Sequence, residues 1–280
     1  SVVEGAQTNV KICQNNFMAN HTNQVVSLLN INGASAIIGG DIIVNSTGTS
    51  FAFSSVTTPS GAVATTTING DLRATAGIIN LSTQSGNFTS IVQLKGNLSI
   101  PTGTTLSCTS NTGTIVFSGT SATQTISLAS GSTLGDRVSF EIGDGTNAST
   151  VQLINQNLVL TNAVNKVTVN DKGILDFNYR DITGSGPFEL KAGGTLKVTS
   201  AAGINASGAT GNVQSSGTRT ISQSGIFHYI GNVTPQATGT AITSGSTGKV
   251  ITIEKTNPTD VVNLTQSTGT TGRLEIIEGT

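Results

Sequence analysis

Hydrophobic residues recur at every second position in short stretches of this chain, for example in 113–117, 138–142 and 194–198. Alternation of this kind places successive side chains on opposite faces of a β-strand. The residues between these stretches are mostly Gly, Ser, Thr, Asn and Asp, which favour turns. No stretch of useful length has the 3.6-residue period of an amphipathic helix. The pattern therefore predicts an all-β protein made of many short strands.

Three segments share the order glycine, polar residue, hydrophobic residue, and their spacing indicates how the strands are arranged. The glycines are Gly40, Gly70 and Gly96, which follow one another at intervals of similar length. Such spacing fits one coil of a β-solenoid, in which two or three short strands make one circuit. A β-sandwich would need hairpins, and two-residue Asn-Gly turns between long strands are scarce. We therefore predict an elongated parallel β-helix or β-solenoid with short strands, irregular turns and a right-handed coil. A pair of β-sandwiches is the alternative.

A longer repeat relates GTIVFSGTSATQ (113–124) to GIFHYIGNVTPQ (225–236). Matching positions of the two segments are Gly113/Gly225, Ile115/Phe227, Phe117/Tyr229, Gly119/Gly231 and Gln124/Gln236, all at one constant separation along the chain. We expect the two hydrophobic pairs to point into the core and the second glycine of each segment to stand at a turn. The glutamine amides are expected to bond to the backbone at that turn. This organisation predicts a cap or diverged coil at 1–24 and a solenoid at 25–280, with a complete unit at 113–224 and a truncated one at 225–280.

The charge content is low, with 10% charged residues and a net charge of −1, against roughly 25% charged residues in an average soluble domain. Nucleic-acid binding needs a concentrated basic surface, and no dense basic run is present. Hydrophobic runs fall well short of the ~20 residues that span a bilayer. We therefore expect no nucleic-acid partner and no direct membrane insertion. Because the chain does not begin with Met and ends in a strand-like segment, we expect it to be part of a longer protein.

The two cysteines, Cys13 and Cys108, could form one disulfide. However, TLSCTS (105–110) matches TLKVTS (195–200), so Cys108 occupies the position of a valine, Val198. A thiol packs as a small hydrophobic residue. The sequence favours this core position for Cys108 and leaves the disulfide open.

A β-helix can also carry a polysaccharide-degrading site, which requires two carboxylates facing each other across the scissile bond. The candidate acids are Asp136, Glu141, Asp144, Asp171, Asp176, Asp181 and Glu189. The best local cluster is LDFNYRD, where Asp176 and Asp181 stand near Arg180 and Tyr179 adds an aromatic face. A solvated loop with an Asp–Arg pair is the favoured interpretation.

The sequence gives little support for a metal site or for a catalytic triad. GDGTN (143–147) resembles a calcium loop but supplies one carboxylate, whereas such sites use six to eight oxygen ligands; a plain turn is expected. His21 and His228 have no Cys or His at zinc-ligand spacing, and alternation points His228 away from the core. We therefore predict no catalytic residue, no metal ligand and no cofactor.

The long repeat resembles the units of large, repetitive surface and secreted proteins of Bacteroidota-type bacteria, exported by the type IX secretion system. Its segments are similar to those units at Gly113, Ile115, Phe117, Gly119 and Gln124, at Gly225, Phe227, Tyr229, Gly231 and Gln236, and in the strands at 250–254 and 261–264. The similarity covers about 96 to the C-terminus, and related patterns occur in filamentous-haemagglutinin-like adhesins.

The resemblance implies an extracellular stalk, adhesin or matrix component at the bacterial cell surface. Its expected partners are cell-surface glycans, other surfaces or envelope proteins. The alternatives are a carbohydrate-active or glycan-binding β-helix protein, and a segment that assembles with copies of itself or with another envelope protein.

Overall fold

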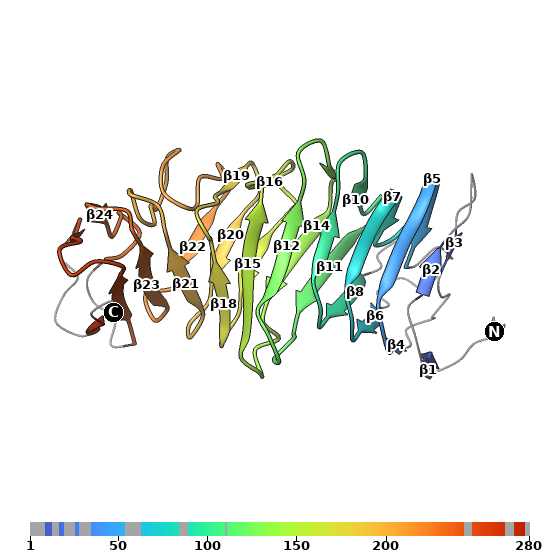
Figure 1. Cartoon of the computed structure of the whole chain (residues 1–280), viewed down its shortest axis with the longest axis horizontal. Coiled ribbons are helices and arrows are strands. Elements are labelled where there is room, and N and C mark those ends of the chain that lie inside the picture. Colours follow the sequence, from blue (N-terminus) through green and yellow to red (C-terminus); the bar gives the residue numbers. More distant parts are fainter. Residues whose placement is uncertain are drawn as a thin grey trace. The chain divides into compact units, whose positions relative to one another are not determined.

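The computed structural model describes residues 9–12, 17–19, 26–27, 35–53, 63–83, 89–109, 111–243, 248–266 and 272–277. This part of the chain contains strands and turns and no helix, and its parallel sheets stack as a β-solenoid of about eight turns. The predicted fold class is confirmed. The β-sandwich alternative is wrong, because sandwiches are built from antiparallel strands, whereas the strands here pair in parallel (Figure 1). The chain divides into two compact units, 1–119 with 124–140, and 120–123 with 141–280.

The first unit contains two parallel sheets. Its strands are β1 (Asn9–Ile12), β2 (Phe17–Ala19), β3 (Val26–Ser27), β4 (Ser35–Ile38), β5 (Ile42–Ala52), β6 (Val63–Ile68), β7 (Leu72–Asn80), β8 (Thr89–Leu94), β9 (Leu98–Ile100), β10 (Thr105–Ser107), β11 (Thr112–Phe117), β12 (Gln124–Leu128) and β13 (Thr133–Leu134). One sheet has the order β1-β4-β6-β8-β11. The other has the order β13-β10-β7-β9-β12, and β5 joins it by pairing with β7, β2 and β3. Alternation of the two sheets along the chain is the mark of a coil.

The second unit continues the same construction with a further face. Its strands are β15 (Ser149–Asn155), β16 (Leu158–Leu160), β17 (Val167–Val169), β18 (Gly173–Asp176), β19 (Ile182–Gly184), β20 (Phe188–Leu190), β21 (Thr195–Val198), β22 (Arg219–Ile221), β23 (Ile226–Gly231), β24 (Gln236–Ala237), β25 (Val250–Lys255), β26 (Val262–Asn263) and β27 (Arg273–Ile277), while β14 (Val138–Ile142) lies at the division between the units. The sheets are β17-β20-β22 and β15-β18-β21-β23-β25-β27, with the short pairs β16-β19 and β24-β26.

The pairing register of the first unit matches the glycine spacing in the sequence. Leu72 in β7 pairs with Ile42 in β5, one coil earlier, and with Leu98 in β9, one coil later. Leu98 in turn pairs with Ile126 in β12. All four side chains are buried. The prediction that Gly40, Gly70 and Gly96 mark successive coils is therefore confirmed.

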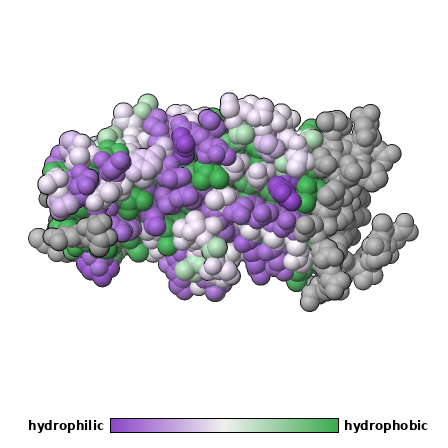
Figure 2. Space-filling model, viewed as in Figure 1, coloured by the Kyte–Doolittle hydropathy of each residue, from purple (hydrophilic) through white to green (hydrophobic). Residues whose placement is uncertain are grey.

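Stacked hydrophobic rows form the core of each unit. In the second unit one such row contains Val151, Leu175, Leu196 and Phe227, which pair from strand to strand and are fully buried. Burying each of these side chains contributes about 1.5–3 kcal/mol. Hydrophilic or intermediate residues cover most of the described surface on the face shown in Figure 2. Strands such as β12 and β14 thus contribute every second residue to the core.

Several predictions fall outside the described residues. Cys13 and His21 are among them, as is most of 1–24, although β1 pairs with β4 and β2 with β5. A cap at 1–24 and the unit boundaries at 113–224 and 225–280 stay predictions. Cys108 is a buried thiol, in keeping with the hydrophobic position predicted for it.

Candidate functional site

A ladder of side chains joins successive coils of the first unit at one corner. The backbone N–H of Asp71 donates to Asp41 Oδ1 at 2.8 Å, and that of Asn97 donates to Asp71 Oδ1 at 2.7 Å. The backbone N–H of Thr125 then donates to Asn97 Oδ1 at 2.8 Å. A Cβ on Gly70 would overlap the Asp41 carboxylate, so glycine is required beside the ladder. Each coil is thereby bonded to the next through a side chain as well as through the backbone.

Gln124 makes a second connection between coils of this unit. Its side chain is buried, and its Nε2 donates to the backbone oxygens of Leu94 at 2.9 Å and Gly96 at 2.5 Å, in the preceding coil. Its Oε1 accepts the backbone N–H of Gly119 at 2.8 Å. A Cβ on Gly119 would overlap the backbone oxygen of Lys95. The side chain therefore closes its own turn and fixes that turn to the coil before it.

Gln236 makes the corresponding bonds in the second unit with a different acceptor contact. Its Nε2 donates to the backbone oxygens of Val198 at 3.1 Å and Ser200 at 3.0 Å, again in an earlier coil. Its Oε1 accepts Lys255 Nζ at 2.6 Å, and that ammonium also donates to the oxygen of Val233 at 2.9 Å. Burial lowers the pKa of Lys255, while the nearby Asp260 carboxylate acts in the opposite direction. The donor to the glutamine Oε1 is thus the buried Lys255 ammonium at Gln236, whereas it is the backbone N–H of Gly119 at Gln124.

The hydrophobic pairs of the long repeat are in the core: Ile115, Phe117, Phe227 and Tyr229 are all fully buried. Burial raises the pKa of Tyr229 well above its usual value, and its hydroxyl donates to the oxygen of Thr238 at 2.7 Å.

The first glycine of each repeat segment lies against a leucine. A Cβ on Gly113 would lie 2.5 Å from Leu81 Cβ, and one on Gly225 would lie 2.6 Å from Leu190 Cδ2. Glycine is required at both positions because a larger residue would overlap the side chain of a core leucine.

Tyr179 forms an exposed corner in the second unit. Asn178 and Tyr179 both have positive φ, 45° and 59°, a region that non-glycine residues other than Asn and Asp rarely adopt. The backbone N–H of Tyr179 donates to Thr199 Oγ1 at 3.0 Å, and its hydroxyl donates to Asn232 Oδ1 at 3.2 Å. The side chain is 51% exposed. A Cβ on Gly231, whose φ is +85°, would overlap the Tyr179 hydroxyl, so this glycine leaves room for the tyrosine.

A tyrosine at position 179 does not make this corner more stable than other residues would. A non-glycine residue in a sparsely populated backbone region costs about 1–3 kcal/mol. The Tyr179 hydroxyl forms two solvent-exposed hydrogen bonds with Asn232, since it also accepts the Asn232 backbone N–H at 3.4 Å, and each contributes about 0.5–1.5 kcal/mol at most. The contact with Asn232 therefore offsets the backbone cost at best, and Asn or Gly at 179 would form the turn more favourably.

The two carboxylates predicted to cluster at LDFNYRD are bonded to separate partners. Asp176 Oδ1 accepts the N–H of Asn178 at 2.9 Å, and Asp176 Oδ2 accepts Gln152 Nε2 at 3.1 Å. Asp181 accepts Asn212 Nδ2 at 3.2 Å and Gln214 Nε2 at 2.8 Å. Burial raises the pKa of Asp181, and these two amide donors counteract it.

Asn212 was missed in the sequence, yet it connects several segments of the second unit. Its side chain is buried; Oδ1 accepts the N–H groups of Thr199 and Ser200, both at 2.9 Å, and Nδ2 also donates to the oxygen of Arg180 at 3.0 Å. These partners lie well before it in the chain and at unequal distances along it, so no local pattern could have identified it.

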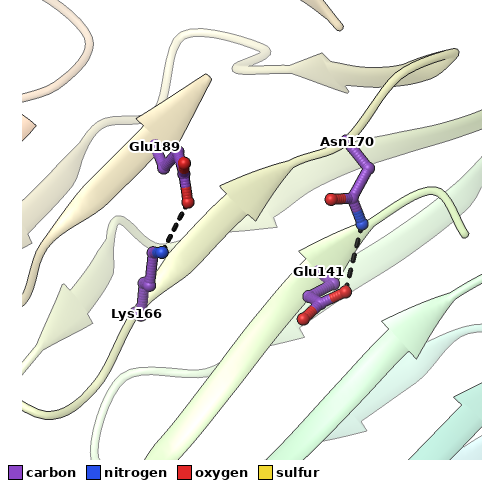
Figure 3. A network of polar contacts seen from close by, with 4 residues as sticks. All are labelled: Glu141, Lys166, Asn170 and Glu189. Carbon is purple, nitrogen blue, oxygen red and sulfur yellow. Dashed lines mark hydrogen bonds and ion pairs between the residues drawn. The ribbon is translucent and has the colours of Figure 1, made fainter. Parts of the chain in front are cut away.

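Two further candidate acids, Glu141 and Glu189, lie in separate contacts in the second unit (Figure 3). Glu189 Oε2 is 2.5 Å from Lys166 Nζ, and Glu141 Oε2 accepts Asn170 Nδ2 at 3.1 Å. Asn170 is buried and also donates to the oxygen of Gly143 at 2.7 Å. These contacts link neighbouring coils in the same manner as the ladder at Asp71.

The loop at 143–147 is a turn closed by its own aspartate. Asp144 accepts the N–H groups of Thr146 and Asn147, both at 2.8 Å, and Asn147 Nδ2 at 3.2 Å. Burial alone would raise the pKa of Asp144, but these donors outweigh it and lower the pKa. Asp171 lies against Gly193 of the next coil, and Asp136 is exposed.

His228 lies on the outer face of β23, between the buried Phe227 and Tyr229. Its Nε2 is 2.8 Å from Glu254 Oε2, and its side chain is 17% exposed. Lys197 and Thr252 pair with it on either side. Burial lowers the pKa of His228, Glu254 opposes this effect and Lys197 adds to it.

The outer row of side chains brings unlike charges together at one pair of strands and places Lys197 beside His228 at the next. Asp176 pairs with Lys197, and Thr252 separates His228 from Glu275 along the stack. Opposite charges on facing strands stabilise a sheet, whereas like charges destabilise it.

No family model, curated protein or solved structure matches this chain. Within the described residues, no group of three or more His, Cys, Asp and Glu side chains could hold a metal ion. The same residues include no helix long and apolar enough to cross a membrane. Function must therefore be inferred from the fold and its contacts.

Proposed function

We propose that this chain is a structural and adhesive segment of a large bacterial cell-surface or secreted protein, in which the β-solenoid serves as a rigid stalk. The observation that carries the proposal is the side-chain ladder from Asp41 through Asp71 and Asn97 to Thr125. In each of three successive pairs of coils, a side-chain oxygen of one coil accepts a backbone N–H of the next, in addition to the parallel strand pairing.

Such bonding suits a load-bearing element. In a solenoid each coil contacts only its neighbours, so the strength of the whole depends on each coil-to-coil interface. Buried amides such as Gln124 and Asn212 bond to backbone groups at the turns. Proteolysis depends on local opening of the chain, which these bonds oppose. Rigidity and protease resistance are the properties that an extracellular stalk requires.

The adhesive part of the proposal is supported by the outer surface and by the resemblance of the long repeat to bacterial surface proteins. Thr, Ser, Asn and Gln are frequent among the exposed described residues, and the face shown in Figure 2 is mostly hydrophilic or intermediate. Such a surface suits contact with glycans, other surfaces or envelope proteins. We expect an extracellular location, no nucleic-acid partner, no membrane insertion and no cofactor.

The polysaccharide-degrading alternative is not favoured. Asp176, Asp181, Glu141 and Glu189 each contact an amide or ammonium group of a neighbouring segment. A general acid with a raised pKa, opposed by a second carboxylate, would be needed for glycoside cleavage, and Asp181, whose pKa is raised, is held by two amide donors.

The test uses the complete 280-residue chain in three parallel assays. We expect slow digestion by a non-specific protease, retention of chain-coated beads on glycan-coated or cell surfaces under flow, and no release of reducing ends from a polysaccharide panel. Rapid digestion at the coil corners would overturn the stalk. Absence of retention on every surface would overturn adhesion, and sugar release would revive the enzyme.

A further inference from the structure

We propose that the corner at Tyr179 is a sugar-binding site, in which the exposed ring stacks on a neutral pyranose and Asn232 bonds to its hydroxyls. The inference rests on the proposed adhesive role and gives that role a ligand class.

The tyrosine side chain extends along the stack of coils. Tyr179 follows β18, β21 lies next to β18 in the sheet, and β23 lies next to β21. The backbone N–H of Tyr179 bonds to Thr199 after β21, and the hydroxyl bonds to Asn232 after β23. The residue is therefore bonded through its backbone to the next coil and through its hydroxyl to the coil after that, with half of its surface open to solvent.

The surrounding residues hold the ring in place before any ligand arrives. Asn178 Nδ2 donates to the oxygen of Leu153 at 3.2 Å, and its N–H donates to Asp176. Gly231 leaves the space that the hydroxyl occupies. A strained backbone kept by its surroundings is a feature of ligand sites, and a preorganised side chain loses little entropy on binding.

The chemistry of the corner favours a sugar. Among the described residues Tyr179 is the one exposed aromatic side chain, and an aromatic ring offers an apolar face with a polar edge. The C–H face of a pyranose matches that surface, and its hydroxyls match the amide of Asn232 and the tyrosine hydroxyl. Asp176 and Asp181 flank the corner along the chain against one arginine, Arg180, which disfavours an acidic sugar.

The experiment exploits the presence of only two tyrosines in the chain, Tyr179 and Tyr229. The complete chain, labelled on its tyrosine rings, is titrated with oligosaccharides of glucose, galactose, mannose, N-acetylglucosamine and uronic acids, and followed by NMR. We expect a neutral oligosaccharide to shift the resonances of Tyr179 and leave those of the buried Tyr229 unchanged.

Two variants distinguish the contribution of the tyrosine ring to binding from that of the backbone conformation. Tyr179→Asn removes the ring but keeps a residue that tolerates positive φ, and it should weaken binding about tenfold, the value of a lost aromatic contact. Tyr179→Phe keeps the ring and should bind within about threefold of the unaltered chain. Unchanged Tyr229 resonances in Tyr179→Asn verify that the variant is folded.

The outcomes distinguish this site from the proposed function. If no sugar shifts Tyr179, or if Tyr179→Asn binds as tightly as the unaltered chain, the site is refuted, and binding confined to uronic acids refutes the neutral ligand class. Beads coated with Tyr179→Asn that still adhere leave adhesion standing without this site. Beads coated with the unaltered chain that adhere nowhere refute adhesion as well.

Discussion

The backbone N–H of Asn97 lies 2.7 Å from Asp71 Oδ1, a carboxylate of the preceding coil. Asp71 and Asn97 therefore occupy the same corner in two successive coils. The Asp71 carboxylate also accepts Asn97 Nδ2 at 3.1 Å, so one oxygen fixes both the backbone and the side chain of the following coil.

We expect Asp71→Ala to weaken this corner by about 1.5–3 kcal/mol, the contribution of a hydrogen bond to a charged group. Asp71→Asn should stay within about 0.5 kcal/mol of the unaltered chain, because it keeps Oδ1 and relieves repulsion from the stacked Asp41. Hydrogen exchange at the Asn97 amide measures the effect locally. Asp136→Ala, at an exposed position of the same unit, is the control. Equal protection of Asn97 in both Asp71 variants would contradict the role of the carboxylate.

Gln124→Glu should destabilise the chain more than Gln124→Ala at pH 7. The alanine variant removes the acceptor of the buried Gly119 N–H, at a cost of about 1–3 kcal/mol. The glutamate variant also places a carboxylate against the oxygens of Leu94 and Gly96. Burial and these oxygens should raise the folded-state pKa of the new carboxyl above its unfolded value of about 4.3.

The pH dependence tests this reasoning. Because the folded-state pKa is raised, stability of Gln124→Glu should be greatest below about pH 4.3 and should fall as pH rises through the folded-state pKa. Urea unfolding of Gln124→Glu, Gln124→Ala and the unaltered chain at pH 4 and pH 7 measures the difference. A glutamate variant with the same pH profile as the alanine variant would contradict the geometry.

Gly231→Ala should cost more than Gly208→Ala, although both glycines have similar positive φ, +85° and +90°. At Gly208 a Cβ would meet nothing within 4 Å, so only the backbone cost of about 1–2 kcal/mol remains. At Gly231 the Cβ would overlap the Tyr179 hydroxyl.

Adding Tyr179→Asn should remove the steric part of the Gly231→Ala cost and leave its backbone part. A double-mutant cycle on unfolding free energies measures this coupling. Additive effects of the two substitutions would show that the tyrosine does not lie where the contact places it.

The second unit should lose stability as pH falls below about 6.5, owing to His228. Its folded-state pKa is lowered by burial, whereas the unfolded value is about 6.5. Its contribution is therefore complete above about pH 6.5 and is lost as pH falls through the folded-state pKa. His228→Gln should flatten the stability profile between pH 5 and pH 7 in thermal unfolding. A profile that keeps its slope in this variant would assign the pH dependence to another group. Asp181, with a raised pKa, changes stability in the opposite sense and nearer pH 4.

Much of the fold could be predicted because a solenoid repeats local rules. Alternation identified β11 and β23, and the spacing of Gly40, Gly70 and Gly96 indicated the coil length that the pairing of Leu72 with Ile42 and Leu98 confirms. Both glutamine amides bond to backbone oxygens of an earlier coil, and Gln124 also bonds to its own turn at Gly119, as expected, whereas the Oε1 of Gln236 accepts Lys255 instead.

The candidate site was only partly predictable. Tyr179 was singled out as an aromatic face beside Asp176 and Asp181, yet the carboxylates bond to separate partners. Asp181 meets Asn212 and Gln214, which flank Val213, the residue of the next coil that pairs with Ile182. The irregular turn between β21 and β22 sets that separation, so no regular spacing in the sequence identifies them.

The sequence by itself determined the strands, their parallel coils and the inward faces, because alternation and glycine spacing depend on neighbours along the chain. Only the tertiary structure decided what each corner contacts. Gln124 opens β12, which pairs with β9, and accepts a backbone N–H, whereas Gln236 opens β24, which pairs with β26, and accepts Lys255. The physical reason is that turns of unequal length bring different groups of the neighbouring coil to the same motif.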